Sequence, residues 1–145
     1  MGSEMCIRDR IEEAASIAQA TEFIDSKSAK YDSPIAQGGT NVSGGQKQRL
    51  SIARAIAKDP KIYIFDDSFS ALDLKTEADL YSELSAKKYD VTRIIIAQRI
   101  ASVKNADRIV VMDNGRLADV GSHSELIKTS EIYKDIYESQ LKGNE

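Results

Sequence analysis

The sequence predicts an α/β domain in which a parallel sheet is preceded and followed by helices. Two apolar runs support this, because residues 62–65 and 93–97 each have the composition of a short buried strand. The stretch "KTEADLYSELSAKK" between them has a helical pattern. A strand, a helix and a second strand in this order are typical of a parallel pair. With 145 residues, 41% hydrophobic and 30% charged, the chain is long enough for one domain with a core.

Ahead of the first strand the chain is predicted to be mainly helical. Apolar residues at helical spacing over Ile11–Ala18 predict a short helix, and the loop "AKYDSPIAQGGTN" follows it. Ser43, with Gln46 three residues later, forms the pattern of a capping box. A helix is therefore expected from about Gly45 to Lys58, because Pro60 prevents its continuation.

After the second strand the chain is predicted to form a hairpin and then helices. "RIVVM" and "RLADV" flank a turn at Asn114-Gly115, which is a strong hairpin signal. Ser122 and Glu125 form a second capping-box pattern. The lone histidine, His123, is expected to be exposed at that helix start and to carry no chemistry. The last helix is expected to have an apolar stripe formed by Ile132, Tyr133, Ile136, Tyr137 and Leu141.

Charge and composition exclude several classes of protein. The 20 basic and 23 acidic residues give a net charge of -3, which argues against a nucleic-acid-binding surface. The basic residues Lys47, Arg49, Arg54 and Lys58 are therefore expected to form a solvated helix face. A single cysteine, Cys6, excludes an internal disulfide and favours a reducing compartment. No apolar run approaches the length that spans a bilayer.

The stretch "VSGGQ" is a candidate phosphate-binding site. Gly44 and Gly45 at a capped helix start allow backbone N–H groups to approach an anion closely, and the helix dipole adds to the attraction. The alternative is that the two glycines only form a tight turn.

The stretch "IYIFDDSFSALD" is the second candidate site. A carboxylate at the C-terminal end of a buried parallel strand is where P-loop NTPases hold a nucleotide-bound magnesium ion. Asp66 suits the metal, and Asp67 occupies the position that positions or deprotonates a water. The alternative is that both residues only begin a turn, with Asp73 capping the next helix.

Together, "VSGGQKQRLSIARA" and "IYIFDDSFSALD" resemble the nucleotide-binding domain of ATP-binding cassette (ABC) transporters of the multidrug and lipid exporter type. By this resemblance Ser43, Gly44, Gly45 and Gln46 match the signature motif, residues 62–66 the Walker B strand, and residues 70–73 the D-loop. "IIIAQRIASV" matches the switch segment, and "IAQGGTN" resembles the segment that faces the membrane domain. The resemblance implies ATP and Mg²⁺ as cofactors, with Asp73 among the nucleotide-binding residues and Asp66 on the metal.

Two departures from the family pattern fall at its catalytic positions, besides Val42 in the signature, where leucine is usual. The family usually has glutamate where Asp67 stands and histidine where Gln98 stands. Aspartate withdraws its carboxylate by about 1.5 Å, and an amide cannot relay a proton as imidazole does. Asp67 and Gln98 are thus expected to be weak catalytic residues. The chain then resembles the partner with a degenerate site in a heterodimeric exporter, whose signature completes the other site.

The resemblance also defines the expected domain organisation. Residues 1–10 are expected to be an appended segment, and residues 11–145 the C-terminal part of the cassette, with the signature region at about 11–58 and the remainder at 59–145. A Walker A motif and a Q-loop are absent from the sequence, so the chain by itself is expected to be inactive. The expected partners are a second nucleotide-binding domain and transmembrane domains fused upstream, at the cytoplasmic face of the plasma membrane. A non-hydrolysing nucleotide clamp and a soluble DNA-maintenance ATPase remain the alternatives.

Overall fold

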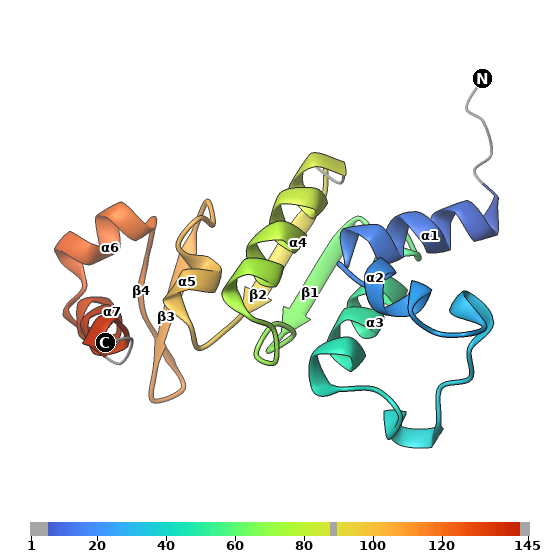
Figure 1. Cartoon of the computed structure of the whole chain (residues 1–145). Helices are drawn as coiled ribbons and strands as arrows, with labels where there is room; N and C mark the ends of the chain where they lie inside the picture. The colour runs from blue at the N-terminus through green and yellow to red at the C-terminus, as the bar shows by residue number, and fades with distance from the viewer. Residues whose placement is uncertain (1–5, 88–89, 143–145) are drawn as a thin grey trace. The chain divides into compact units, whose positions relative to one another are not determined.

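The computed structural model describes residues 6–87 and 90–142 and divides into two compact units, Met1–Ile96 and Ala97–Glu145 (Figure 1). The first unit combines helices with one pair of strands, and the second combines a hairpin with helices. The first unit contains α1 (Ile7–Ile17), α2 (Thr21–Asp25), η1 (Lys30–Asp32), η2 (Gln37–Gly39), α3 (Gly44–Ile56), β1 (Ile62–Asp66), α4 (Leu74–Lys87) and β2 (Thr92–Ile96). The second contains α5 (Ile100–Val103), β3 (Ile109–Asp113), β4 (Arg116–Gly121), α6 (His123–Thr129) and α7 (Glu131–Lys142).

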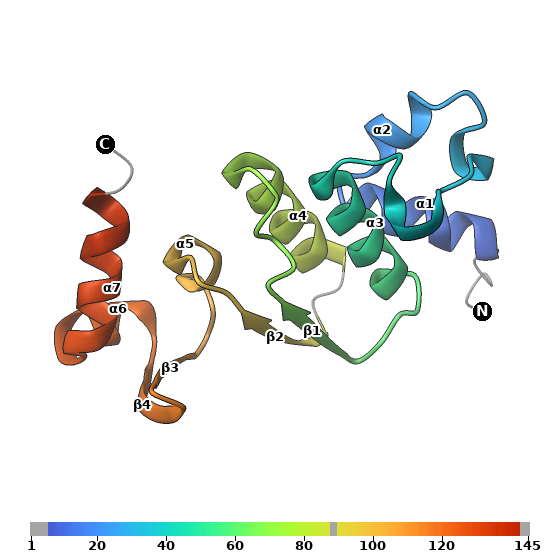
Figure 2. The ribbon, with the colours of Figure 1, turned by 90° about the horizontal axis from the view of Figure 1, so that it is seen from below.

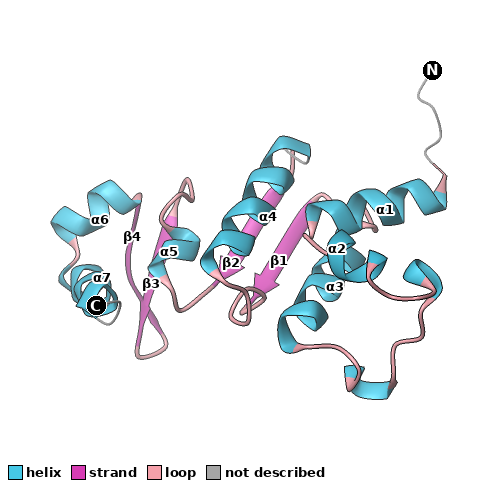
Figure 3. Cartoon of the chain, viewed as in Figure 1, coloured by secondary structure: helices cyan, strands magenta, loops and turns pink. Residues whose placement is uncertain are grey.

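The parallel pair predicted from the sequence is confirmed. Strands β1 and β2 run in the same direction, in a register that pairs Ile62 with Thr92 and Asp66 with Ile96 (Figure 3). Helix α4 connects them, as a parallel crossover requires. The carboxyl ends of both strands therefore lie at the same edge of the sheet. Figure 2 shows α4 alongside this pair from a second direction.

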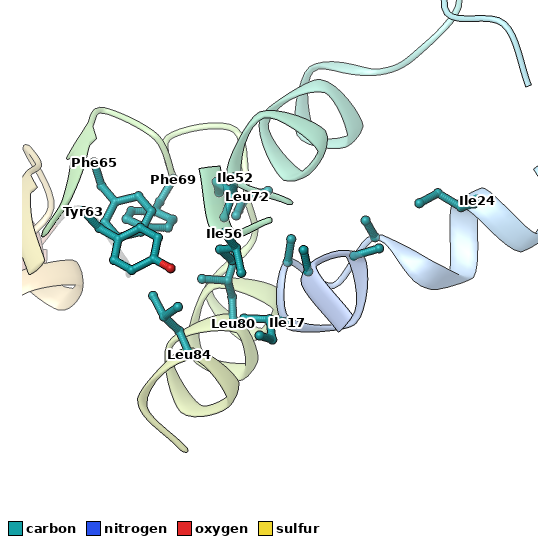
Figure 4. Packing of buried hydrophobic residues seen from close by; sticks show 14 of the residues in the cluster. Ile17, Ile24, Ile52, Ile56, Tyr63, Phe65, Phe69, Leu72, Leu80 and Leu84 are labelled. Carbon is teal, nitrogen blue, oxygen red and sulfur yellow. The ribbon is translucent and has the colours of Figure 1, made fainter. Parts of the chain in front are cut away.

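The core of the first unit lies on one face of the β1–β2 pair. Tyr63 and Phe65 point into it, and their rings stack with centroids 5.8 Å apart, while Phe69 adds a third ring 5.1 Å from Phe65. Aliphatic side chains from the surrounding helices join the cluster (Figure 4). They include Ile17 of α1, Ile24 of α2, Ile52 and Ile56 of α3, and Leu80 and Leu84 of α4.

The two strands, predicted to be buried, are covered on one face only. Ile62 is 57% exposed and Ile64 is 67% exposed, and Ile94 and Ile96 of β2 are exposed in the same way. Successive side chains of a strand point to opposite faces, and the residues of the core cluster include only the alternate positions of β1. In the described residues the strands therefore have one buried and one exposed face.

Helix α1 begins earlier than predicted. Its N-cap is Cys6, whose Sγ accepts from the Asp9 backbone N–H at 3.5 Å, so residues 7–10 are helical. The expectation that residues 1–10 are an appended segment stays a prediction.

The second unit confirms the predicted hairpin and capping box. Asn114 and Gly115 have φ values of 48° and 74°, the pair of left-handed residues that a type I′ turn requires. The Ser122 and Glu125 side chains each bond to the other residue's backbone N–H at the start of α6. In the apolar stripe of α7, Tyr133 is buried, whereas Ile136 and Leu141 are exposed.

The expectation that His123 is exposed is wrong. Its side chain is half-buried, and Nδ1 forms a hydrogen bond of 2.8 Å with the Tyr133 hydroxyl. The imidazole also meets the rings of Tyr133 and Tyr137 edge-on, at centroid distances of 5.7 and 5.4 Å. His123 therefore joins the start of α6 to α7, a contact between residues that sequence periodicity does not connect.

Candidate functional site

Helix α3 begins with the predicted capping box. The Gln46 backbone N–H donates to Ser43 Oγ at 3.2 Å, and the Ser43 N–H donates to Gln46 Oε1 at 3.0 Å. Both side chains are therefore engaged in holding the helix start. The N–H groups of the first turn have no acceptor within their own helix, so a helix start of this kind is suited to accept an anion at Gly44 and Gly45.

The two glycines of α3 are required for different reasons. A Cβ on Gly45 would lie 3.0 Å from the Ala71 carbonyl oxygen, so the helix start touches the backbone of the loop after β1. A Cβ on Gly44 would have Ala71 Cβ as its nearest neighbour at 3.8 Å, an ordinary contact. Gly45 therefore allows the start of α3 to pack against the loop after β1. Gly44 has no such contact and leaves the exposed side of the helix start accessible.

Asp66 and Asp67 lie at the carboxyl end of β1 with exposed side chains. The Asp67 backbone N–H donates to the Ile96 carbonyl at 3.0 Å, which continues the pairing of β1 with β2 by one residue. Asp67 has a φ of 47°, in the left-handed region where aspartate is enriched over most residues. The strand thus ends abruptly, and both carboxylates remain in solvent.

Gln48 of α3 holds the loop that follows Asp67. Its Nε2 donates to Ser70 Oγ at 3.0 Å and lies 3.4 Å from the Asp67 carbonyl oxygen, while its Oε1 accepts from the Ala71 N–H at 3.0 Å. Gln48 was not predicted as a site residue. Its spacing of three and four residues from the two glycines, which places it on their face of the helix, was the available signal.

Asp73 caps helix α4, as one of the two sequence interpretations proposed. Its carboxylate accepts from the Thr76 backbone N–H at 2.9 Å and from the Thr76 hydroxyl at 2.7 Å. The bond from the Thr76 backbone, and to a smaller extent that from its hydroxyl, holds the pKa of Asp73 below its ordinary value of 3.8. Asp73 is thus ionised and ordered at the end of the loop that Gln48 holds.

Gln98 belongs to the second unit, two residues after the end of β2. Its side chain is exposed, and its backbone carbonyl accepts from Gln140 Nε2 at 2.8 Å. The Gln140 Oε1 accepts from the Ile100 N–H at 2.9 Å, so one amide of α7 fixes the backbone on both sides of Arg99. Gln140 was missed because it lies 42 residues away from Gln98 in the sequence.

The carboxylates at the end of β1 fit a nucleotide-bound magnesium ion. Magnesium is usually held by one or two carboxylates together with substrate phosphates and water, and Asp66 and Asp67 supply two exposed carboxylates. Within residues 6–87 and 90–142, no group of three or more His, Cys, Asp or Glu residues forms a cage for a metal. The two carboxylates therefore suit a magnesium ion whose other ligands are nucleotide phosphates and water.

The basic face expected on α3 is only partly solvated. Arg49 is half-buried, donates from Nη1 to the Gln19 carbonyl at 2.7 Å, and places its guanidinium 5.2 Å from the centre of the Phe23 ring. Lys47 donates to the Gly38 carbonyl at 2.8 Å. These two cations therefore secure α3 to the segments before it, while Arg54 and Lys58 are exposed.

A parallel strand pair that ends in carboxylates, beside a capped helix that begins with two glycines, is typical of nucleotide-binding α/β domains. Residues 3–70 match the family model described as "ABC transporter". Over 140 residues the chain is 48% identical to the "Uncharacterized ABC transporter ATP-binding protein YfiB" of Bacillus subtilis, covering 97% of this chain and 24% of that protein. It is 42% identical, with the same coverage, to an "ATP-dependent lipid A-core flippase" of Saccharophagus degradans.

A solved structure supports the same family. The chain matches a bacterial Atm1-family ABC exporter with ATP bound, with a TM-score of 0.89 and 37% identity, over 96% of this chain and 24% of that one. The chain is therefore part of an ABC transporter nucleotide-binding domain. It spans about a quarter of the length of these relatives. None of the helices in the described ranges is both long and apolar enough to cross a membrane.

Proposed function

We propose that the chain is part of the ATP-hydrolysing module that energises an ABC exporter, and that its signature motif completes the nucleotide site of a partner domain. The observation that carries this proposal is the start of α3, where a capping box orders the helix and leaves Gly44 exposed. Backbone donors at a helix start favour a phosphate. The names of the relatives, which include a flippase and an exporter, support the exporter class.

The strand-end residues have separate roles in this proposal. Asp66 contributes to binding Mg²⁺, which neutralises phosphate charge, and Asp67 orients the attacking water. Gln98 donates a hydrogen bond to phosphate from its amide. Since a displacement of about 1 Å at a catalytic group costs roughly 100-fold in rate, Asp67 gives this chain's own site slow hydrolysis or none.

We further propose that the partner domain is not identical to this one. A site with the shorter Asp67 carboxylate and without a histidine at Gln98 needs a competent second site if the transporter is to turn over. That second site would use Ser43, Gly44, Gly45 and Gln46 of this chain. The module would then be one half of a heterodimer at the cytoplasmic face of the plasma membrane.

The contact with the membrane-spanning domains is proposed for the loop before α3. Asn41 closes this loop by accepting from the Ala36 N–H at 3.0 Å and donating to the Pro34 carbonyl at 3.0 Å. Ile35 is 48% exposed on the loop. It also lines a cleft of about 450 Å³ together with apolar side chains of α1, α2 and α3.

Steady-state ATP hydrolysis by the full-length heterodimer tests the proposal. Gly44→Asp places bulk and negative charge where the partner's phosphate would lie, so turnover should fall by about 100-fold or more, whereas Asp67→Ala should lower it less than about threefold. Ser51→Ala, on an exposed position of α3, is the control. If Asp67→Ala abolishes turnover while Gly44→Asp leaves it intact in folded protein, the assignment of a degenerate site is wrong. Nucleotide that stays trapped at both sites through many cycles would instead identify a non-hydrolysing clamp.

A further inference from the structure

The segment from Asp67 to Leu72 has little regular structure of its own and is held by α3. Between the end of β1 and the start of α4 it is neither strand nor α-helix. Its backbone is held partly by turn bonds, such as that from the Leu72 N–H to the Phe69 carbonyl at 3.0 Å, and partly by partners outside the segment. Gln48 supplies one donor and one acceptor to this segment, at Ser70 Oγ and at the Ala71 N–H, both at 3.0 Å. A side-chain amide thus replaces the pairing that a strand would provide.

The bonds continue from Gln48 to the backbone of Asp67. The Ser70 hydroxyl, which accepts from Gln48, itself donates to the Asp67 carbonyl at 3.1 Å. A hydroxyl accepts and donates at once, so Gln48, Ser70 and Asp67 form a continuous chain of hydrogen bonds. Beyond it, the Asp67 N–H is fixed on β2. A movement of Gln48 therefore reaches the backbone of the candidate catalytic residue.

A packing contact beside these bonds prevents independent movement. The Ala71 carbonyl oxygen lies against the Cα of Gly45, where an added Cβ would be 3.0 Å away. The first turn of α3 cannot approach the loop without displacing Ala71, and it cannot withdraw without stretching the bonds of Gln48.

We propose that Gln48 is a positioning residue that couples the signature motif to Asp67. In the proposed function, on which this inference rests, Ser43–Gln46 serve the nucleotide of the partner, while Asp67 serves the nucleotide of this chain. Gln48 belongs to the signature helix and bonds to the loop of Asp67. Binding of the partner's nucleotide to the signature motif therefore shifts Asp67. The occupancy of one nucleotide site thus affects the other site through a single chain.

Hydrogen exchange in the full-length heterodimer tests this coupling without relying on hydrolysis. Gly44→Asp serves as the perturbation at the signature, and deuterium uptake is followed in a peptide covering residues 67–72. With Gln48 present, the perturbation should change the uptake. In the Gln48→Leu background, uptake by this peptide should be faster throughout and no longer respond to Gly44→Asp. An equal response in both backgrounds overturns the proposal.

Enzyme kinetics provide the second readout. In the full-length heterodimer without the partner's catalytic glutamate, where the remaining turnover belongs to this chain's site, Gln48→Leu should lower kcat about fivefold with little change in KM, the loss that one ordinary hydrogen bond represents. Ser70→Ala should reproduce part of that loss and add little to it in the double variant, because both act on the same chain of bonds. Fully additive losses would overturn the proposal, as would an unchanged kcat in Gln48→Leu.

Two further variants distinguish coupling from folding and from the proposed function. Gln48→Glu keeps an acceptor for Ala71 but loses the donor to Ser70, so it should retain the melting temperature better than Gln48→Leu while still uncoupling the sites. Ser51→Ala, on the same helix, should change neither readout. If the unsubstituted transporter hydrolyses no ATP, the proposed function fails, and the exchange experiment still decides the coupling.

Discussion

Two glutamines, one in each unit, hold the backbone near a candidate catalytic residue in the same way. Gln48 bonds to the loop after Asp67, and Gln140 bonds to the backbone at Gln98 and Ile100. They differ in the helix that carries them. Gln48 lies on α3, whose first turn is itself part of the candidate site, whereas α7 contains no candidate site residue. An amide of the same kind therefore connects two segments of the candidate site in one unit and restrains a single segment in the other.

Among the changes that bear on this comparison, the largest effect is expected from placing the family's usual side chains at the two candidate catalytic positions. If Gln48 and Gln140 already position the backbone at Asp67 and Gln98, the double substitution Asp67→Glu and Gln98→His should raise hydrolysis at this chain's site by about tenfold or more. The reason is the rate cost of a misplaced base. The gain is reduced because Asp67 has a φ of 47°, and a left-handed conformation costs most residues about 1 kcal/mol.

The measurement uses the full-length heterodimer after the partner's catalytic glutamate has been removed, so that remaining turnover belongs to this site. Each single substitution is the matched control for the double one. No gain from the double substitution would mean that Asp67 and Gln98 do not limit hydrolysis at this site. The comparison between Gln48 and Gln140 would then concern structure only and not catalysis.

The next effect concerns the anchor in the second unit. Gln140→Leu leaves the Gln98 carbonyl and the Ile100 N–H without this partner, and an unsatisfied partly buried group costs about 1–3 kcal/mol. Because Ile100 is a buried residue of the local core, the loss should appear as a lower melting temperature of the full-length protein and as faster amide exchange at residues 98–100.

Glu138→Gln, on an exposed position of α7, is the control for this substitution. Gln140→Leu should not change the exchange of residues 67–72 in response to Gly44→Asp, because its helix contains no signature residue. A change there would contradict the distinction between an anchor that couples and an anchor that only restrains.

Much of the fold followed from local sequence signals, whereas the anchors did not. The capping box at Ser43, the Asn114-Gly115 turn and the parallel strands each depend on residues close in sequence or on simple periodicity, and each is confirmed. The family and the strand-end carboxylates were also predictable, because their motifs are contiguous. Gln48 and Gln140 act over 22 and 42 residues, on backbone groups that no sequence pattern marks.

Two wrong expectations have the same physical origin. Arg49 was expected in solvent, and its guanidinium instead meets the Gln19 carbonyl and the Phe23 ring. The strands were expected to be buried, and Ile64 is 67% exposed. Charge and hydropathy state what a side chain prefers, while the packing partners that the fold brings together decide where it lies.

A smaller effect separates the two glycines that begin the Gln48 helix. Gly45→Ala forces Ala71 to move, and overpacking at its mild end costs about 1 kcal/mol. Gly44→Ala meets no close atom and should stabilise the helix by up to about 1 kcal/mol, as alanine does relative to glycine. Thermal unfolding of the two variants side by side measures the difference. Equal melting temperatures would show that the loop does not press on α3, which removes one of the two contacts proposed to couple them.

The smallest effect is expected at Asp73, which orders the other end of the loop that Gln48 holds. Because hydrogen bonds from Thr76 lower the folded pKa of Asp73 below 3.8, its contribution to stability is complete above that value and is lost as the pH falls through the lower folded pKa. Asp73→Asn keeps an acceptor for the Thr76 N–H but does not titrate. The melting temperature of the full-length protein should therefore be slightly higher than that of its Asp73→Asn variant near neutral pH, and the two should converge below about pH 3.8.

Glu125→Gln is the matched control in the second unit, since hydrogen bonds from Ser122 lower the pKa of Glu125 in the same way. It should show the same convergence without altering exchange at residues 67–72, whereas Asp73→Asn should speed that exchange. If Asp73→Asn leaves the exchange unchanged at every pH, Asp73 does not help to hold the loop.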